Sequence, residues 1–383
     1  MGAATACFLA RDHGLAAIVI ERDPAYRRAS SALSASSIRQ QFSSAVNIAL
    51  SQRSLGFFRR IGEELQVAGE RPGIGLVEPG YLYLASASGA SLLRQQHDLQ
   101  RSLGVDVALL DPDALAARYP WLSLQGLSLG SLGLSGEGWF DGWSVLQAFR
   151  RKAIACGARF VQAEAQALSA VDGRIQRVDC GDGQSFEADQ VVLSAGAWSA
   201  ALLDGLGLDL PVRARKRDVF VFDAPVHLAN APLVIDPGGS WFRPEGGINA
   251  AGHGRFICGG PPRSADTDEP PLEAIDHGLF DDVLWPALAH RVPAFEAARV
   301  VSAWAGYYEM NTFDQNGLVG RFPGWDNLYL ACGFSGHGMQ QAPAVGEALA
   351  QQLATGQWGE LDLDLMSPAR IEQDAAILER CVI

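Results

Sequence analysis

The sequence predicts a two-lobed α/β (α+β) protein in which an α/β domain is interleaved with a β-sheet-rich domain. Residues 1–23 follow a helix–strand pattern, and residues 212–260 are rich in strand-forming runs. Residues 318–356 follow the order strand, strand, glycine-rich turn, long helix. Because α/β segments at both ends flank strand-rich segments, both domains are predicted to be discontinuous. The α/β domain is assigned to residues 1–80, 145–210 and 315–383, and the β-rich domain to residues 81–144 and 211–314.

The first 23 residues, "MGAATACFLARDHGLAAIVIERD", look like the second half of a dinucleotide-binding unit. A small-residue helix is predicted to stop at Gly14, and a buried parallel strand to end at Glu21. In a Rossmann-like unit this acid accepts hydrogen bonds from ribose hydroxyls, and Gly2 would be the last glycine of GxGxxG. The first strand and two glycines would then precede Met1, so we expect a native start about 10 or more residues earlier. The alternative is a helix packed on a strand without a ligand.

The intervening elements are predicted from local patterns. A small-polar loop at 30–42 is followed by a helical pattern to residue 68, a strand at 81–85, helices at 91–103 and 144–156, and a short capped helix at 111–122. Residues 159–199 are predicted as a strand, a hairpin with a turn at Asp172-Gly173, and the buried strand "QVVLSAG". A further helix is predicted near 273–290.

The segment "LYLACGFSGHGMQQAP", residues 328–343, carries the sharpest motif. A buried strand leads into a turn with three glycines and then into a helix. Glycines let the backbone approach a ligand closely, and the helix N-terminus offers free N–H groups. Such a site suits a phosphate or the pyrimidine edge of a flavin. A tight strand–helix turn without a ligand is the alternative.

Composition limits the function classes. The net charge is −13 and the pI about 5.0, which argues against a nucleic-acid partner. Of the 30 basic residues only Lys152 and Lys216 are lysines, which indicates a GC-rich bacterial genome. The six cysteines are scattered without metal-ligand spacing, and no apolar run approaches the roughly 18 residues that span a bilayer. We therefore expect a cytoplasmic protein with reduced thiols and no metal, and leave peripheral contact with the inner membrane open.

Several motifs resemble, in order and spacing, the glycine/D-amino-acid oxidase superfamily of FAD enzymes. They are the opening segment, "VVLSAGAWS" at 191–199 and "GFSGHG" at 333–338. "SIRQQFS", "AGYYEMNTFDQNGLVG" and "GFSGHGMQQAPAVG" are similar to FAD-dependent oxidoreductase domain-containing proteins, which neighbour the sarcosine and dimethylglycine oxidising enzymes. The resemblance implies an FAD-binding domain of the Rossmann type and a substrate domain.

The resemblance also implies the cofactor contacts. Gly2 would pack under the pyrophosphate, Glu21 would bind the ribose, and the turn before the last helix would cover the flavin. The implied cofactor-binding residues are Gly2, Glu21, Arg22, Ser30, Ser31, Ser36, Ser37, Ala165, Gly196, Trp198, Gly333, Ser335, Gly336, His337, Gly338, Met339 and Gln340. The covalent flavin cysteine of monomeric sarcosine oxidases corresponds to Tyr307, so the FAD is expected to be non-covalent.

For the substrate, Arg39 aligns with the arginine that binds the substrate carboxylate in sarcosine oxidases. A guanidinium offers a planar fork to a carboxylate and stays charged at any working pH. A structural arginine is the alternative. Tyr307, Tyr308 and Glu309 fall in a segment that lines the flavin in relatives, or they are core residues of a strand. His337 is a candidate base or a packed turn residue, and Arg243 is a candidate substrate contact or an exposed strand residue.

Two lysines of the related oxidases are replaced in this chain. The carboxylate-binding lysine corresponds to Gln340, and the oxygen-activating lysine falls near Ile257. We therefore expect an FAD-dependent amine or amino-acid dehydrogenase. It would oxidise the C–N bond of an amino acid or N-methylated glycine derivative and pass electrons to a quinone or protein acceptor. The alternatives are a flavin-bearing scaffold protein and one subunit of a larger amine dehydrogenase. The amine, the acceptor and the oligomeric state stay open.

Overall fold

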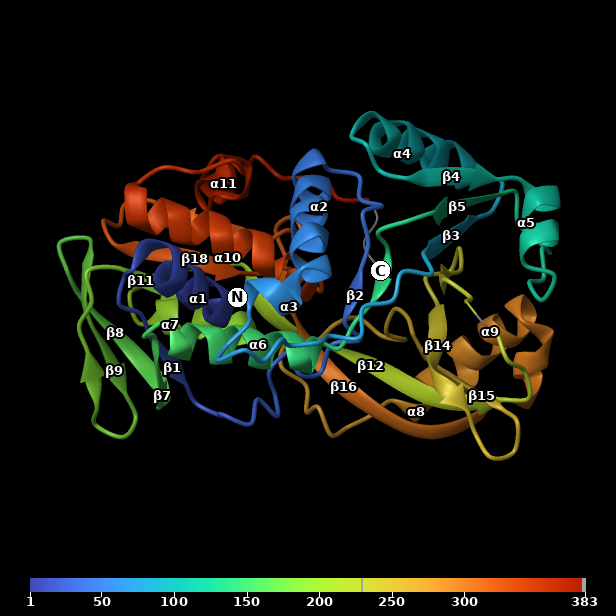
Figure 1. Ribbon diagram of the computed structural model, residues 1–383, viewed down its shortest axis with the longest axis horizontal. Coiled ribbons are helices and arrows are strands. Elements are labelled where there is room, and N and C mark those ends of the chain that lie inside the picture. Colours follow the sequence, from blue (N-terminus) through green and yellow to red (C-terminus); the bar gives the residue numbers. More distant parts are fainter. Residues whose placement is uncertain (229, 381–383) are drawn as a thin grey trace.

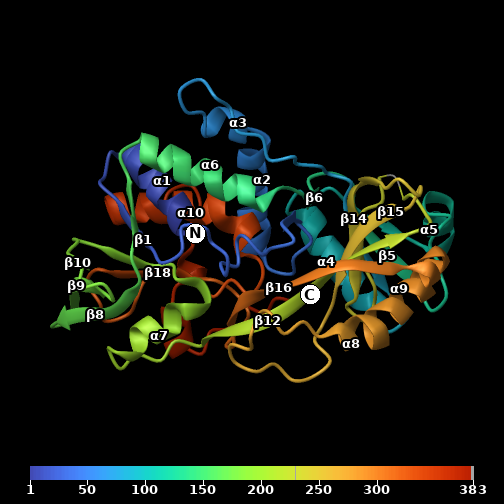
Figure 2. The same ribbon diagram turned by 90° about the horizontal axis from the view of Figure 1, so that it is seen from below.

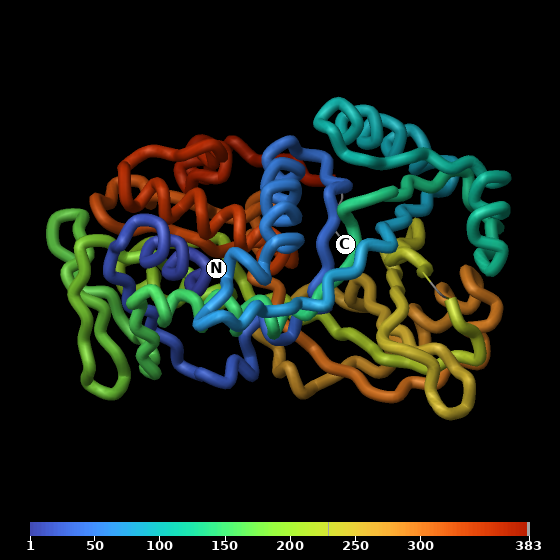
Figure 3. The backbone as a smooth tube through the Cα atoms, in the orientation of Figure 1, coloured from blue at the N-terminus to red at the C-terminus, as the bar shows by residue number. Residues whose placement is uncertain are grey.

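The computed structural model describes residues 1–228 and 230–380, which form two lobes side by side (Figures 1 and 2). Both ends of the chain contribute to the first lobe, and the second lobe comes from two middle segments, as the colours of Figure 3 show. The mixed α/β class with interleaved lobes is confirmed, whereas the individual domain boundaries stay a prediction. Within the described ranges no helix is long and apolar enough to cross a membrane.

The first lobe holds three small sheets covered by helices. In the first sheet, β1 (Ile18–Glu21) pairs in parallel with β7 (Arg159–Gln162). In the second, β18 (Leu328–Cys332) pairs in parallel with β11 (Val191–Leu193) and antiparallel with β17 (Leu318–Arg321). The third is a meander of β8 (Ala165–Val171), β9 (Arg174–Cys180) and β10 (Ser185–Phe186). The helices of this lobe are α1 (Gly2–His13), α2 (Ala45–Arg59), α3 (Ile61–Glu64), α6 (Gly142–Ala155), α7 (Ser199–Asp204), α10 (Gly338–Thr355) and α11 (Ala369–Glu372).

The second lobe is built on one eight-stranded sheet. Its strand order is β16 (Arg299–Asn311), β12 (Val212–Ala224), β15 (Gly254–Gly259), β14 (Trp241–Ile248), β13 (Leu233–Ile235), β3 (Tyr81–Ala85), β5 (Leu129–Gly133), β4 (Val107–Leu110). Helices α4 (Ala90–Ser102), α5 (Pro112–Arg118), α8 (His277–Leu279) and α9 (Trp285–Arg291) flank it. A short pair, β2 (Ser37–Ile38) with β6 (Gly138–Trp139), lies near the junction with the first lobe (Figure 1).

Several local predictions are confirmed. Helix α1 ends at Gly14, whose φ of 63° lets its N–H bond the carbonyl of Leu9. The side chain of Asp111 caps α5 by accepting from Ala114 N at 2.8 Å. The hairpin turn at Asp172-Gly173 has both residues at positive φ. These motifs were predictable because each depends on a few neighbouring residues.

Two local predictions are wrong in detail. Strand β1 is parallel as expected but not buried, since Ile18 is 42% exposed. Within the described chain β1 pairs only with β7, and its residues line the cavity described below. The helix near 273–290 begins only at His277, and a π-helical turn at 280–284 separates α8 from α9. Pro286 in the first turn of α9 has no N–H to continue the preceding hydrogen-bond pattern.

Packing fixes the position of α10 against α1. A Cβ on Gly346 would lie 2.8 Å from the Cβ of Ala4, so glycine is needed at this close helix crossing. The middle of α10 therefore lies against the start of α1. In the second lobe an aromatic core that includes Phe222, Phe242 and Phe295 lies between the sheet and the helices α8 and α9.

Candidate functional site

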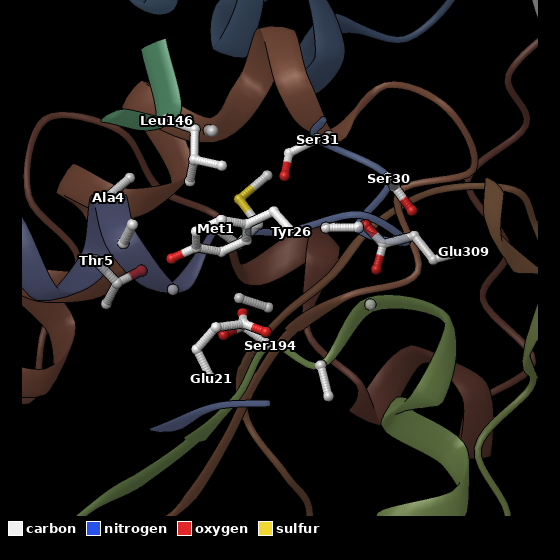
Figure 4. Close-up of a pocket in the computed structure, with 18 of the residues that line it drawn as sticks. Met1, Ala4, Thr5, Glu21, Tyr26, Ser30, Ser31, Leu146, Ser194 and Glu309 are labelled. Carbon is white, nitrogen blue, oxygen red and sulfur yellow. The ribbon is translucent and has the colours of Figure 1, made fainter. Parts of the chain in front are cut away.

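A cavity of about 1050 Å³ lies between α1, the ends of β1 and β11, and the eight-stranded sheet. Figure 4 shows Glu21 and Ser194 on one side of it and Ser30, Ser31 and Glu309 on the other. The structure brings together nearly all predicted site residues along this cavity: Gly2, Glu21, Arg22, Ser30, Ser31, Ser36, Ser37, Arg39, Ala165, Gly196, Trp198, Tyr307, Tyr308, Glu309, Ser335, Gly336, His337, Gly338, Met339 and Gln340. Gly333, Arg243 and Ile257 do not line it.

The end of the cavity next to β1 is shaped for a polar ligand. Glu21 accepts a hydrogen bond from Asp23 N at 2.9 Å, and its pKa is raised by burial. A Cβ on Gly2 would lie 2.6 Å from Ser194 Oγ, so a larger residue there would displace the serine hydroxyl. The guanidinium of Arg22 lies 3.8 Å from the Trp198 ring centre, and its buried Nη2 has no hydrogen-bond partner among the described residues. A buried donor without a partner at a cavity indicates a ligand acceptor.

The predicted glycine turn covers the middle of the cavity. Gly336 has a φ of 94°, and a Cβ there would lie 2.5 Å from the Tyr308 ring. Ser335 also has a positive φ of 51°, and its Oγ accepts a hydrogen bond from Asn311 N at 2.9 Å. The N-terminus of the 18-residue helix α10 follows directly. Backbone N–H groups and the positive end of the helix dipole therefore face the cavity.

Glu309 lines the cavity and also holds the start of this turn, at Gly333. The N–H of Gly333 donates to Glu309 Oε2 at 3.1 Å, and the N–H of Ser335 donates to the Glu309 carbonyl at 3.1 Å. Gly333 thus holds the turn from beneath and does not contact the cavity. Burial raises the pKa of Glu309 to about 7, so this carboxyl carries a proton over part of the neutral range.

Arg39 is buried and lines the same cavity, where groups of the glycine turn hold it. Its Nη2 donates to His337 Nε2 at 3.1 Å, and its Nη1 donates to the Gln41 carbonyl at 2.6 Å. The backbone N–H of Arg39 donates to Gln340 Oε1 at 2.9 Å, and the guanidinium stacks 4.0 Å from the Phe42 ring centre. Gln340 therefore anchors the backbone of Arg39.

His337 accepts the hydrogen bond from Arg39 as a neutral imidazole. Because a guanidinium can only donate, His337 Nε2 must accept, which places the ring proton on Nδ1. Burial and the neighbouring Arg39 charge lower the pKa of His337 to about 3. His337 is therefore uncharged at neutral pH, and it orients Arg39.

Several candidates lie outside the cavity. Arg243 donates to the Ala35 carbonyl at 3.0 Å and pairs with Glu245, so it supports the serine-rich loop. Ile257 is its buried cross-strand partner on β15. Cys332 is fully buried within β18, and burial raises its pKa. The five cysteines in the described ranges are free thiols, and Cys381 lies outside those ranges.

Sequence reasoning missed Glu137, a fully buried carboxylate behind Arg39. It accepts hydrogen bonds from Gln40 N at 2.6 Å, Gln41 N at 2.9 Å and Gln41 Nε2 at 2.8 Å. A Cβ on Gly133 would lie 1.9 Å from its Oε2, so that glycine makes room for the carboxylate. The glycine-rich segment "GSLGLSGEGW" was the one available signal, and it matched no motif.

Sequence reasoning also missed Glu379, near the C-terminal end. Its carboxylate accepts from Ser43 N at 2.8 Å, Ser44 Oγ at 3.1 Å and Asn47 Nδ2 at 3.1 Å. A carboxylate at the N-terminus of α2 stabilises this helix, because it interacts with the positive end of the helix dipole. The loop that carries Arg39 is thus fixed by acids from two distant parts of the chain.

The geometry fits FAD, the cofactor expected from the resemblance. The cavity holds a carboxylate at the end of a parallel strand, two glycines without room for a Cβ, an unsatisfied arginine donor and a helix N-terminus. These groups suit a ribose, a pyrophosphate and the electron-poor ring of a flavin.

Comparisons with known proteins agree. The family model of DAO, the FAD-dependent oxidoreductases, matches residues 1–352. The "FAD-dependent oxidoreductase domain-containing protein 1" of Xenopus laevis is 41% identical over 407 residues, which cover 97% of this chain and 80% of the relative. A glycine oxidase of Geobacillus kaustophilus is 28% identical and covers 80% of this chain and 76% of the relative. The solved structure of L-proline dehydrogenase from P. horikoshii has the same fold, with a TM-score of 0.84, 24% identity, and coverage of 98% and 96%.

The relative at 41% identity is an animal protein, so the comparisons give no support to the bacterial source that the arginine content indicated. The family match agrees with the motifs at both ends of the chain, which the structure brings to one cavity. The chain therefore belongs to the DAO family of FAD-dependent oxidoreductases.

Proposed function

We propose that the protein is an FAD-dependent dehydrogenase that oxidises the C–N bond of an amino acid or an N-methylated glycine derivative. One observation carries the proposal: the buried Arg39 lines the cavity, where His337 of the glycine turn holds its guanidinium and Gln340 of α10 holds its backbone N–H. A carboxylate-binding group is therefore tied to the elements that would contact the flavin. The relationship to a glycine oxidase supports an amino-acid substrate.

Each group has a role that follows from its geometry. Bound FAD would supply the acceptor for a hydride from the carbon next to the amine. Arg39 would bind the carboxylate through its planar fork and so fix the orientation of that carbon. His337 would stay neutral and orient Arg39, and Glu309 would hold the turn and carry a proton at its Oε1, since Oε2 accepts from Gly333. The substrate amine would react in its neutral form.

Two observations support non-covalent FAD and a non-oxygen acceptor. The Tyr307 hydroxyl donates to the Pro270 carbonyl at 2.7 Å, and Cys332 is buried away from the cavity lining. Neither lysine of the chain lines the cavity. Of the lining arginines, Arg217 beside Tyr308 pairs with Asp266 at 2.7 Å, and Arg39 would be occupied by the substrate carboxylate. A fixed free cation beside the flavin would favour the reaction with oxygen. Electrons would instead pass to a quinone or a protein acceptor.

The test is anaerobic reduction of the FAD-loaded protein by a panel of amino acids and N-methyl glycines. The proposal predicts that one class bleaches the visible flavin band and that the band recovers slowly in air. Fast recovery in air would make the protein an oxidase. A flavin that no amine bleaches would refute the proposed reaction and favour a scaffold or a partner subunit.

A further inference from the structure

An aromatic and apolar wall lies on the cavity side of the eight-stranded sheet. Tyr81 on β3 is the register partner of Leu233 on β13, and Trp241 on β14 is the partner of Ile235 on β13. Register partners, and residues two apart on one strand, project to the same face of a sheet. Tyr81, Leu233 and Trp241 all line the cavity, and we call these three residues the apolar wall.

The opposite face of the same strands is already filled. Leu82, Val234 and Phe242, which alternate with the wall residues, pack in the core against α8 and α9. The two faces therefore have different tasks: one closes the hydrophobic core, and the other borders the ligand cavity. Tyr81 and Leu233 also pack on each other with Trp241 against them, so the wall is a preformed apolar surface.

The apolar wall stands next to Arg39. The side chain of Gln41 donates to the Tyr81 carbonyl at 3.1 Å, and the Arg39 guanidinium lies 5.8 Å from the ring centre of Tyr83, two residues along β3. Two charged residues that line this part of the cavity are paired elsewhere: Arg217 with Asp266 at 2.7 Å and Asp218 with Lys216 at 3.2 Å. The apolar wall is therefore the apolar part of the cavity lining near Arg39.

We propose that the substrate carries a bulky apolar or aromatic substituent, which packs on the apolar wall while its carboxylate binds Arg39. This inference rests on the proposed function and narrows its substrate class, because glycine and sarcosine offer nothing to bury against Tyr81, Leu233 and Trp241. Burial of an apolar group raises affinity in proportion to the area removed from water.

The test is calorimetric titration of the FAD-loaded protein with acetate and with phenylacetate, which present the same carboxylate without and with a ring. Phenylacetate is expected to bind at least about tenfold more tightly than acetate. The variant Trp241→Ala should weaken phenylacetate about tenfold and leave acetate within about twofold. The matched control Trp285→Ala lies on α9, outside the cavity lining, and should change neither affinity.

The outcomes separate this inference from the proposed function. Equal affinities of acetate and phenylacetate, both lost in Arg39→Ala, would refute the apolar wall as a specificity element and leave the carboxylate site intact. An unchanged preference for phenylacetate in Trp241→Ala would also refute it. If neither acid binds the wild-type protein while its FAD is bound, the carboxylate site itself is absent, and the proposed function fails with it.

Discussion

Replacement of Arg39 tests the role of this residue in carboxylate binding. A guanidinium that binds a carboxylate through both arms makes two charge-assisted hydrogen bonds, each worth about 1.5–3 kcal/mol. Arg39→Ala should therefore cost about 3–6 kcal/mol of ligand binding, which weakens a carboxylate by at least about a hundredfold. Arg39→Lys keeps the charge but loses the fork and the stacking on Phe42, so about tenfold to a hundredfold is expected.

The structure also says what these variants should leave unchanged. Alanine keeps the backbone N–H that donates to Gln340 Oε1, so the glycine turn and the affinity for FAD should be preserved. His337 and the Gln41 carbonyl lose a partner, which costs about 1–3 kcal/mol of folding free energy. Calorimetry with phenylacetate measures binding, and flavin fluorescence measures FAD affinity. If Arg39→Ala binds the acid as tightly as wild type, the carboxylate lies elsewhere and the reasoning is wrong.

Three further changes test the supports of the site. Since the pKa of Glu309 is raised from 4.5 to about 7, the free energy of unfolding should fall as pH rises through this window, and Glu309→Gln should flatten that fall in urea titrations. Gly336→Ala places a Cβ 2.5 Å from the Tyr308 ring and should abolish FAD binding. The control Gly356→Ala, whose Cβ would meet no atom within 4 Å, should only lower the free energy of unfolding, by about 1 kcal/mol. Arg370→Ala breaks the buried ion pair with Asp314 and should lower the free energy of unfolding by about 3–5 kcal/mol. The control Arg53→Ala, which breaks the exposed ion pair with Glu347, should cost less than about 1 kcal/mol.

Each of these expectations has a clear contrary result. An unchanged pH dependence in Glu309→Gln would show that another group titrates in this window. Tight FAD binding by Gly336→Ala would mean that the turn does not need glycine to approach the flavin. Equal losses of stability in Arg370→Ala and Arg53→Ala would show that burial does not distinguish the two ion pairs.

The motif-bearing parts of the site could be predicted from sequence. Helix α1 with its stop at Gly14, the acid at the end of β1, and the turn before α10 each depend on a few consecutive residues with restricted backbone geometry. In this chain these local signals agree with the tertiary fold. Sequence marks a glycine turn but not which of its glycines faces the cavity, and Gly333 lies outside the lining.

The remaining parts depend on contacts between distant segments. Glu137 meets the loop after Arg39 through three hydrogen bonds that join the loop before β6 to the loop after β2. Tyr81 and Leu233 become neighbours only because β3 pairs with β13, a parallel pairing that no local pattern specifies. A buried carboxylate and an apolar wall carry no sequence signature, since single acidic and aromatic residues occur throughout the chain.

The most direct test of the account is a crystal structure of the FAD-loaded protein with phenylacetate. The account predicts a flavin beneath the turn at 333–338, the carboxylate within hydrogen-bonding distance of both arms of the Arg39 guanidinium, and the ring against Trp241. A flavin in this place with the acid bound away from Arg39, or no ordered acid at all, would contradict the proposed amino-acid site.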